Sequence, residues 1–373
     1  MRSAVPRVAL SHDWLNGMRG GEKCLEILCE LYPDAPIYTL FYEKGKVSDK
    51  IARHAVFSSR LQRFPSVFNR YRYYLPFYAS AVSAFKLKKY DLVLSTSHCV
   101  AKGIRKNKEA LHVCYCFTPA RYAWGFFEDY FSSMNWFSRL LIGRTLKRFR
   151  KWDLKNNQGI DHFVAISQTV RQRIQKHYGR EAEVIYPPAD TVYYAPDGIS
   201  VKRDGYLVVS ALVPYKRIDL AVRAFNRSGK KLVIVGDGPE RKKLEGMAKK
   251  NIRFLGWQPD SVLRDHYRRS LALIFPGEED FGIVPVEAQA CGCPVIAFGR
   301  GGVLETVLEN ETGVFFREQT EESLMNAIQR FESGFLDPEL ARKNAERFSK
   351  ERFQMEMKSM IQCQFLSRER VKR

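Results

Sequence analysis

Residues 279–287 read Glu279-Asp-Phe-Gly-Ile-Val-Pro-Val-Glu287, and this stretch decides how the second half of the chain folds. The apolar run before it, 271–275, predicts a buried strand, and the residues after Gly282 predict a helix. One carboxylate therefore lies in the connecting loop and the other on the helix. Backbone N–H groups at a helix start bind phosphate, and carboxylates accept hydrogen bonds from pairs of hydroxyls. The stretch predicts a site for a nucleotide sugar rather than an acidic loop in solvent.

Strand and helix patterns alternate along the whole chain. Short apolar runs predict buried strands, with polar turns and stretches of helical spacing between them. The predicted strands cover residues 7–10, 91–95, 111–116 and 162–167, then 205–210, 231–235, 252–255, 271–275 and 294–298. The double proline Pro187-Pro188 separates the two series. The pattern predicts an α/β protein with mostly parallel sheets and two domains joined at about residues 185–200.

The composition agrees with a globular protein of two domains. The chain has 373 residues, of which 45% are hydrophobic, so it can form two separate cores. Its eight cysteines include pairs with C-x-C spacing, which is not that of a zinc or thioredoxin motif, and they indicate buried reduced thiols. Neither a signal peptide nor an apolar run of membrane-spanning length is visible, so we expect a cytoplasmic protein.

The net charge of +20 is concentrated in the first half of the chain. Residues 1–190 hold 31 Lys and Arg against 16 Asp and Glu, whereas residues 191–373 hold 30 against 25. Residues 50–90 contain nine Lys and Arg, many aromatics and no carboxylate. Such a mixture suits an anionic membrane face or a nucleic acid, and it also occurs on solvated surfaces over an aromatic core. No nucleic-acid recognition motif is visible, so we expect an anionic membrane surface as partner and no nucleic acid.

Candidate anion-binding groups follow the strands of the second half. In open α/β sheets, ligands bind beyond the carboxyl ends of the strands. Lys216 follows the first strand of this half, where its ammonium group can meet a diphosphate. Glycine-bearing turns at 236–238 and 299–302 allow backbone N–H groups to approach an anion. One such turn is weak evidence, but several at the same end of one sheet indicate a phosphate site.

These motifs resemble those of the retaining glycosyltransferases of family four. In the second half the resemblance rests on Ser210–Asp219, Gly236–Glu240, Phe254–Gly256 and Glu279–Gly292. In the first half, residues 11–14 and 17–22 resemble that family's acceptor-side glycine loop. Cys114–Trp124 resembles a subgroup that acts in O-antigen, lipopolysaccharide, capsule and exopolysaccharide assembly and contains many mannosyltransferases.

The resemblance implies the GT-B architecture, in which two Rossmann-like domains face each other across a cleft. Residues 1–187 would form the acceptor-side domain, and residues 188–345 the domain that binds the nucleotide sugar. Residues 346–373 would form a C-terminal helix that returns to the first domain, followed by a basic tail.

The resemblance also implies roles for individual residues in the second half. Glu279 would hold hydroxyl groups of the donor sugar, Lys216 would meet its diphosphate, and Glu287 would hold the ribose hydroxyls. Backbone groups would approach the sugar, the phosphate and the base. The backbone groups near the sugar and phosphate would be those of Phe281, Gly282 and Ile283. The backbone groups near the base would be those of Gly256 and Trp257.

In the first half, the resemblance implies that Gly20 and Gly21 let a loop reach the diphosphate and the acceptor. One departure concerns the charge at the diphosphate. The family usually has an arginine where this chain has Ala211. We expect Arg217 or Arg121 to stabilise the departing diphosphate in its place.

A second departure concerns a histidine. Phe117 stands where the subgroup usually has a histidine that faces the reacting sugar. His98, at the end of the preceding predicted strand, can take over that catalytic role. Alternatively, it is a strand-end histidine with no part in catalysis.

The sequence, together with this resemblance, therefore predicts a retaining hexosyltransferase that uses mannose from GDP-mannose and a lipid-linked or polysaccharide acceptor in surface glycan biosynthesis. A front-face reaction is expected, because Glu279 is assigned to the sugar hydroxyls and no other carboxylate is an obvious candidate for a covalent intermediate. We expect no cofactor and no essential metal, since no Asp-x-Asp pair stands at a strand end, and a location at the inner face of the cytoplasmic membrane. Two alternatives stay open: a non-catalytic or weakly active protein that binds nucleotide sugars or membrane surfaces, and a nucleotide-sugar epimerase of the same fold.

Overall fold

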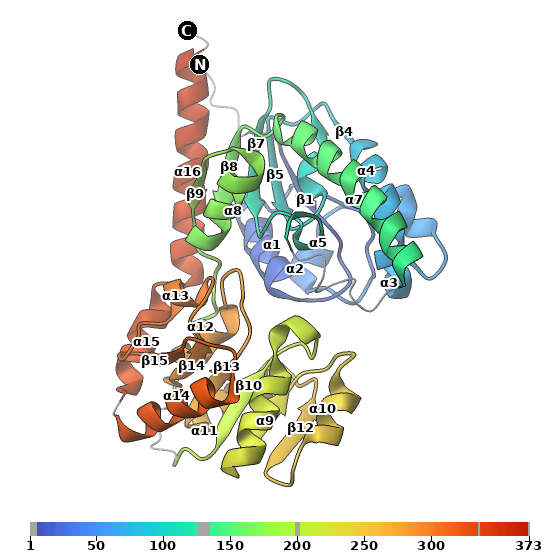
Figure 1. The fold of residues 1–373 in the computed structure, drawn as a ribbon. Coiled ribbons are helices and arrows are strands. Elements are labelled where there is room, and N and C mark those ends of the chain that lie inside the picture. The colour runs from blue at the N-terminus through green and yellow to red at the C-terminus, as the bar shows by residue number, and fades with distance from the viewer. Residues whose placement is uncertain (1–5, 126–134, 198–201, 335, 372–373) are drawn as a thin grey trace. The chain divides into compact units, whose positions relative to one another are not determined.

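The computed structural model describes residues 6–125, 135–197, 202–334 and 336–371, with no side-chain description for 369–371. The chain divides into two compact units (Figure 1). Unit 1 comprises Met1–Pro187 together with Phe353–Arg373, and unit 2 comprises Pro188–Arg352. Each unit has its own parallel sheet with helices on its faces, so the predicted α/β class and the pair of Rossmann-like domains are confirmed.

The sheet of unit 1 has seven parallel strands in the order β3-β2-β1-β5-β7-β8-β9. The strands are β1 (Val8–His12), β2 (Ile37–Thr39), β3 (Val56–Ser58), β5 (Leu92–Ser97), β7 (Leu111–Cys116), β8 (His162–Ala165) and β9 (Ala182–Val184). The three central strands β1, β5 and β7 are buried along their whole length, because helices cover both faces of the sheet. The order reverses between β1 and β5, and this reversal is the switch point where ligands bind in such sheets.

The helices of unit 1 are α1 (Gly20–Leu31), α2 (Asp49–Ala52), α3 (Val67–Arg70), α4 (Leu75–Ser83), α5 (Arg121–Trp124), α7 (Trp136–Asn157) and α8 (Gln168–Tyr178). A small parallel pair, β4 (Lys86–Leu87) and β6 (Arg105–Lys106), lies beside the main sheet. The aromatic residues of 50–90 have two different environments. Seven of them pack in or against the core of unit 1, namely Phe64, Phe68, Tyr71, Tyr74, Tyr78, Phe85 and Tyr90, whereas Phe57, Tyr73 and Phe77 are exposed.

The sheet of unit 2 has six parallel strands in the order β12-β11-β10-β13-β14-β15. The strands are β10 (Tyr206–Val209), β11 (Leu232–Val235), β12 (Ile252–Gly256), β13 (Ala272–Phe275), β14 (Val295–Phe298) and β15 (Gly313–Phe316). The helices are α9 (Ile218–Ser228), α10 (Arg241–Met247), α11 (Asp260–Arg269), α12 (Ile283–Ala290), α13 (Val303–Thr306), α14 (Glu321–Ser333) and α15 (Pro338–Glu346). The switch point of this sheet lies between β10 and β13.

The last helix, α16 (Lys350–Val371), begins in unit 2 and continues in unit 1. Phe353 packs edge-on against Tyr115 with ring centroids 5.4 Å apart, and the Gln354 amide donates to Glu30. Farther along, Arg368 lies 2.5 Å from Asp161. These contacts hold the helix on unit 1, as expected of a C-terminal helix that returns to the first domain.

All eight cysteines are free thiols, and seven of them are buried, which confirms the prediction of buried reduced thiols for all but the exposed Cys363. Burial raises the pKa of the Cys29 thiol to about 12, so this group stays protonated. Within the described ranges, no helix combines the length and the apolar character needed to cross a bilayer.

Candidate active site

The predicted donor residues of unit 2 gather at the switch point of its sheet. Lys216 ends the short helical turn Pro214–Lys216, which follows β10. Glu279 lies in the loop after the neighbouring strand β13. The two side chains form an ion pair, and both are largely buried, with 16% and 22% of their surface exposed. A cation and a carboxylate that lie far apart in the sequence are thus held together at the sheet edge.

The loop after Glu279 leads directly into α12, and its backbone conformation requires glycine at its end. Gly282, at φ +90°, is the residue before the first turn of α12. A methyl group there would meet Pro285 only at 3.5 Å, so the backbone conformation rather than crowding requires glycine. Phe281 is buried and packs edge-on against Phe348, with ring centroids 5.5 Å apart. The backbone from Phe281 to Ile283 is therefore anchored in the core while it starts the helix.

Glu287 lies inside α12 and is only 6% exposed. The hydroxyl group of Tyr267, itself buried, donates to Oε2 of Glu287 at 3.4 Å. Burial, reinforced by the negative charge of Glu287, raises the pKa of Tyr267 well above its ordinary value, so the phenol stays a donor. This contact orients the carboxylate to which the resemblance assigns the ribose hydroxyls.

Glycines in the strand-end loops let these loops pack directly on one another. A side chain at Gly236 or Gly238 would overlap the backbone of Ser210 or Leu212 in the loop after β10. In the same way, Gly301 and Gly302 lie against the backbone of residues 279–281, and the Gly302 N–H donates to the Glu279 carbonyl at 2.8 Å. The glycine turns therefore pack closely on the loop that leads to Lys216 and on the loop that carries Glu279. The sequence pattern indicated only their approach to an anion.

Arg217, Gly256 and Trp257 lie near the same edge of the sheet but have different surroundings. Arg217 has a left-handed backbone at φ +54°, and its guanidinium donates to Gln319 at 3.0 Å and to Asp219 at 3.4 Å. The Gly256 carbonyl accepts the N–H of Gly236 at 2.8 Å, and the Trp257 side chain is exposed. The side chain of Arg217 is thus already engaged within unit 2.

At the switch point of unit 1, a buried carboxylate holds the turn that carries His98. Asp13, directly after β1, accepts backbone N–H bonds from His98, Cys99, Val100 and Ala101 at 2.7–2.9 Å. Its Oδ2 also lies 3.1 Å from Nδ1 of the His98 ring. Burial alone would raise the pKa of Asp13, but His98 and these N–H groups keep it below the ordinary value.

The rest of this edge is built from β1, α1 and β7. His12 contacts Thr96 at 2.7 Å and lies 3.8 Å from Glu22 in the first turn of α1. The ring of Phe117, after β7, is half-buried, with its centroid 6.3 Å from that of His98. A methyl group on Gly21 would meet the Phe117 ring at 3.3 Å, so this glycine allows close packing.

Gly20 and Gly21 are the first two residues of α1 and do not form a free loop. Gly20 has open space beside it, whereas Gly21 contacts the aromatic edge described above. Arg121 begins α5, after β7, and is half-buried. These three residues and His98 all follow carboxyl ends of strands of the same sheet.

Sequence reasoning assigned no role to three residues of these sites: Asp13, Glu22 and Tyr267. Asp13 and Glu22 belong to the quoted first-half motifs, so their position in those motifs was the available signal. Nothing in the sequence connects Tyr267 with Glu287, 20 positions away, and only the packing of α11 on α12 shows it.

Two family models match the chain, one in each half. The model "Glycosyltransferase Family 4" matches residues 38–193, and "Glycosyl transferases group 1" matches residues 195–351. A GDP-mannose-dependent alpha-(1-6)-phosphatidylinositol monomannoside mannosyltransferase of Mycolicibacterium smegmatis is 32% identical over 206 residues, which cover 47% of this chain and 52% of that protein. A D-inositol 3-phosphate glycosyltransferase of Rhodococcus opacus is 30% identical over 201 residues, with 45% of each chain covered. The matched region thus spans about half the length of these curated relatives.

Solved structures resemble the chain over nearly its whole length. The apo lipopolysaccharide outer core galactosyltransferase WaaB has a TM-score of 0.66 at 16% identity, with 96% of this chain and 99% of that chain covered. The Anabaena protein HepE, solved with UDP-glucose, has a TM-score of 0.67 at 18% identity, with 95% and 99% covered. At this identity the likeness concerns the fold alone. The chain thus has the fold of GT-B glycosyltransferases, and a glycosyltransferase family model matches each of its halves.

Proposed function

We propose that this protein transfers a hexose from a nucleoside diphosphate sugar, with retention at the anomeric carbon, to a lipid-linked or glycan acceptor. The observation that carries the proposal is the Lys216–Glu279 pair at the switch point of unit 2, beside the start of α12. A diphosphate needs a cation and N–H donors, and a sugar needs a carboxylate acceptor. Lys216, the helix start and Glu279 supply these three groups within one set of connected loops.

In the proposed reaction, the bond between the anomeric carbon and the β-phosphate oxygen breaks as the acceptor oxygen bonds to that carbon from the same face. The acceptor's proton passes to the departing phosphate oxygen, so the products are the nucleoside diphosphate and the new glycoside. Lys216 and the N–H groups of α12 stabilise the charge that develops on the leaving diphosphate. Glu279 orients the sugar, and no metal or cofactor takes part in this proposal.

The proposed donor is GDP-mannose. The support is the Mycolicibacterium smegmatis relative, whose name describes GDP-mannose dependence, and the resemblance of Cys114–Trp124 to a subgroup rich in mannosyltransferases. Glu287 would accept hydrogen bonds from the ribose hydroxyls, which every common nucleotide carries. Choice among bases then depends on groups near Gly256 and Trp257.

We also propose that unit 1 binds the anionic inner face of the cytoplasmic membrane, where a lipid-linked acceptor would be found. Helix α7 supplies the support. Trp136, Phe137, Leu140 and Leu141 share one side of its first turns, at i and i+4 spacing, and are between 45% and 76% exposed. Arg144 and Arg148 continue the same side and are exposed. Large apolar side chains followed by cations fit the boundary between acyl chains and head groups.

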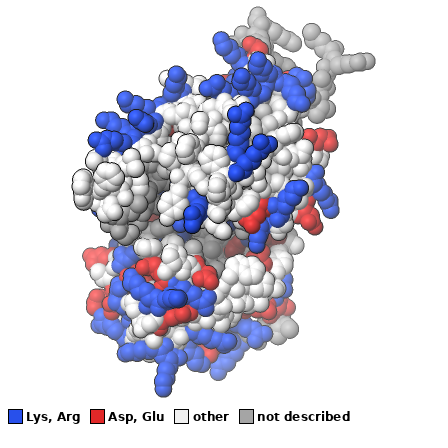
Figure 2. All heavy atoms as spheres, turned by 90° about the vertical axis from the view of Figure 1, so that its right-hand side faces the viewer, with Lys and Arg blue, Asp and Glu red and all other residues white. Residues whose placement is uncertain are grey.

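Charge on this part of unit 1 is suited to an anionic lipid. Helix α7 has seven Lys and Arg but one carboxylate, Asp153, which is fully buried and pairs with Lys102 at 3.0 Å. Figure 2 shows over unit 1 a broad uncharged surface bordered by Lys and Arg. Exposed cations of the carboxylate-free stretch, among them Arg60, Arg63, Arg70 and Arg72, add to it. Each cation near an anionic surface contributes about 1 kcal/mol at low salt.

The experiment that tests the enzymatic proposal is a donor panel. The full chain is incubated with GDP-mannose, UDP-glucose and ADP-glucose, with and without a polyprenyl-linked sugar acceptor, and both nucleotide release and product anomer are measured. We expect release of GDP that depends on acceptor and an α-linked product. A sugar nucleotide converted without nucleotide release indicates the epimerase, and binding without turnover of any donor indicates the non-catalytic alternative.

A further inference from the structure

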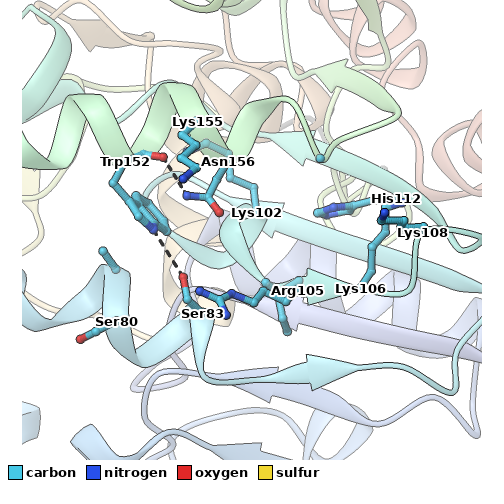
Figure 3. Close-up of a pocket in the computed structure, with 13 residues that line it drawn as sticks. Ser80, Ser83, Lys102, Arg105, Lys106, Lys108, His112, Trp152, Lys155 and Asn156 are labelled. Carbon is cyan, nitrogen blue, oxygen red and sulfur yellow. Dashed lines mark hydrogen bonds between the residues drawn. The ribbon is translucent and has the colours of Figure 1, made fainter.

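Unit 1 contains a cavity at the opposite edge of its sheet from His98. Its volume is about 710 Å³. The end of α4, strand β6, the start of β7 and the last turns of α7 form its walls (Figure 3). The strands β5 and β7 run away from this edge toward the candidate active site, so neither the donor residues nor the His98 turn contributes to the cavity.

The charges that line the cavity are all positive. Its lining includes five Lys and Arg and no Asp or Glu: Lys102, Arg105, Lys106, Lys108 and Lys155. Two of these cations are already paired outside the cavity lining, since Lys102 lies 3.0 Å from Asp153 and Lys106 lies 3.2 Å from Asp161.

The other three cations have no such partner. Within the part of the chain that the structure describes, no acceptor lies within hydrogen-bond or ion-pair distance of Arg105, Lys108 or Lys155. In Figure 3, Arg105 reaches toward Ser83, while Lys155 lies above it and Lys108 lies on the right. The C-terminal end of a helix carries the negative end of the helix dipole, which favours a cation there. This accounts for Lys155, in the last turn of α7. It does not explain Arg105 on β6 or Lys108 in the loop after β6.

The remaining lining offers ordered polar and aromatic groups. The indole N–H of Trp152 donates to Ser83 at 3.4 Å, and the Asn156 amide donates to the Trp152 carbonyl at 2.8 Å. His112 is buried and bonds to Ser95 at 2.9 Å, and burial lowers its pKa to about 3. The histidine is therefore neutral, and the positive charge comes from Lys and Arg.

We propose that this cavity is a binding site for a phosphate group. Arg105, Lys108 and Lys155 are exposed and line one cavity that has no Asp or Glu in its lining, and a phosphate with charge close to −2 would supply the missing counter-charge. Arg105 provides a planar fork for two phosphate oxygens, and Lys108 and Lys155 provide point charges for others. Two kinds of ligand present such a phosphate: a free phosphorylated small molecule and an anionic lipid, through its head group.

The test compares two matched double variants of the full chain. Arg105→Gln with Lys155→Gln removes two unpaired cations from the cavity. Lys44→Gln with Lys176→Gln removes two exposed cations from elsewhere in unit 1. Because Lys216 is itself proposed to meet a diphosphate, all proteins also carry Lys216→Ala. A failure here is then distinct from a failure of the proposed function. Equal melting temperatures show that both variants fold.

Calorimetric titration with inorganic phosphate and with pyrophosphate measures the free-ligand source. Flotation with vesicles of phosphatidylglycerol in phosphatidylcholine measures the lipid source. We expect the cavity variant to lose affinity by about tenfold or more in at least one arm, with the control variant unchanged. Weaker binding of soluble phosphates by the cavity variant would identify the ligand as a small molecule. Weaker flotation alone would identify it as a lipid head group. Equal behaviour of the cavity variant and its control in both arms, or no binding in either, overturns the proposal.

Discussion

The carboxylate of Asp13 lies 3.1 Å from Nδ1 of His98 and also holds the backbone of the turn that carries this histidine. Burial lowers the pKa of His98, Asp13 opposes that effect, and the net pKa stays below the ordinary value of 6.5. The ring is therefore neutral at pH 7. Its Nδ1–H then faces Asp13, and Nε2 is left as an acceptor. This arrangement fits a positioned hydrogen-bond acceptor better than an incidental strand-end histidine.

Asp13→Asn should destabilise the protein and lower the pKa of His98 further. The amide cannot accept all four backbone N–H bonds, and the loss of a buried charged partner costs about 3–5 kcal/mol. Thermal unfolding and NMR titration of the histidines measure the two effects. Asp34→Asn, an exposed change, is the control. An unchanged His98 titration would show that the Asp13–His98 contact does not form in solution.

The same pair predicts how stability depends on pH. The pKa values of Asp13 and His98 both lie below their ordinary values of 3.8 and 6.5 in the folded protein. Their contributions are complete above those ordinary values and are lost as pH falls through the lowered ones. The melting temperature of the wild type should thus fall as pH drops below 6, through His98, and fall further below pH 3.8, through Asp13. In Asp13→Asn the fall between pH 6 and pH 4 should be steeper, because the pKa of His98 is lower still, and the fall below pH 3.8 should be shallower, because the Asp13 carboxylate is absent. Parallel curves for the two proteins would contradict this origin of the acid sensitivity.

Glu279→Ala and Lys216→Ala should have opposite effects on nucleotide binding. Both changes should lower transfer, by about 100-fold or more when leaving-group stabilisation is lost. In Glu279→Ala, however, Lys216 is released from its ion pair, so GDP should bind as tightly as before or more tightly. Calorimetry with GDP gives the answer, with Lys243→Ala as an exposed control. Weaker GDP binding in Glu279→Ala would show that this carboxylate supports the nucleotide rather than the sugar.

Glu287→Ala should weaken the binding of GDP itself. Removing a carboxylate that accepts a hydrogen bond from a ligand hydroxyl weakens the binding free energy by about 1.5–3 kcal/mol. Tyr267→Phe removes only the donor that orients Glu287 and should have a smaller effect of the same sign. The comparison of GDP with its 2′,3′-dideoxy analogue locates the contact. If Glu287→Ala and the wild type bind GDP equally, the ribose assignment fails.

Phe117→His should leave the fold intact and raise or preserve transfer activity. The Phe117 ring is half-buried and borders His12, His98 and Gly21, so an imidazole can keep contact with water. A fully buried position would penalise the polar ring. The activity assay and a melting curve are measured together. A lower melting temperature without any gain in activity would mean that Phe117 is core and replaces no catalytic histidine.

Vesicle flotation tests the membrane surface of unit 1. Binding to vesicles with anionic lipid should weaken with salt, because the attraction is screened. It should weaken further in the quadruple variant with Gln at Arg60, Arg63, Arg70 and Arg72. Trp136→Ser with Phe137→Ser should weaken binding at all salt concentrations, since these side chains are exposed apolar surface. Equal flotation with neutral and anionic vesicles would identify the basic face as solvated surface only.

Local patterns determined most of the fold. Strands such as 111–116 and helices such as 168–178 are continuous runs with one periodicity, so the residue order alone located them. The short strands β2, β3, β9 and β15 were missed because three or four residues show too little periodicity. Helix α7 was missed as well, because its exposed apolar end and its basic residues obscure the helical face.

In the candidate site, too, the sequence located some residues, and only the tertiary structure showed the partners of the others. Glu279, Gly282 and Glu287 lie within one loop and one helix, so their spacing already indicated a common ligand. The partners of Asp13 are 85 to 88 positions away, and Lys216 lies in a different loop from Glu279. Such pairs depend on which strands become neighbours in the sheet. Strand order is set by the packing of the whole domain, so only the tertiary structure could bring these residues together.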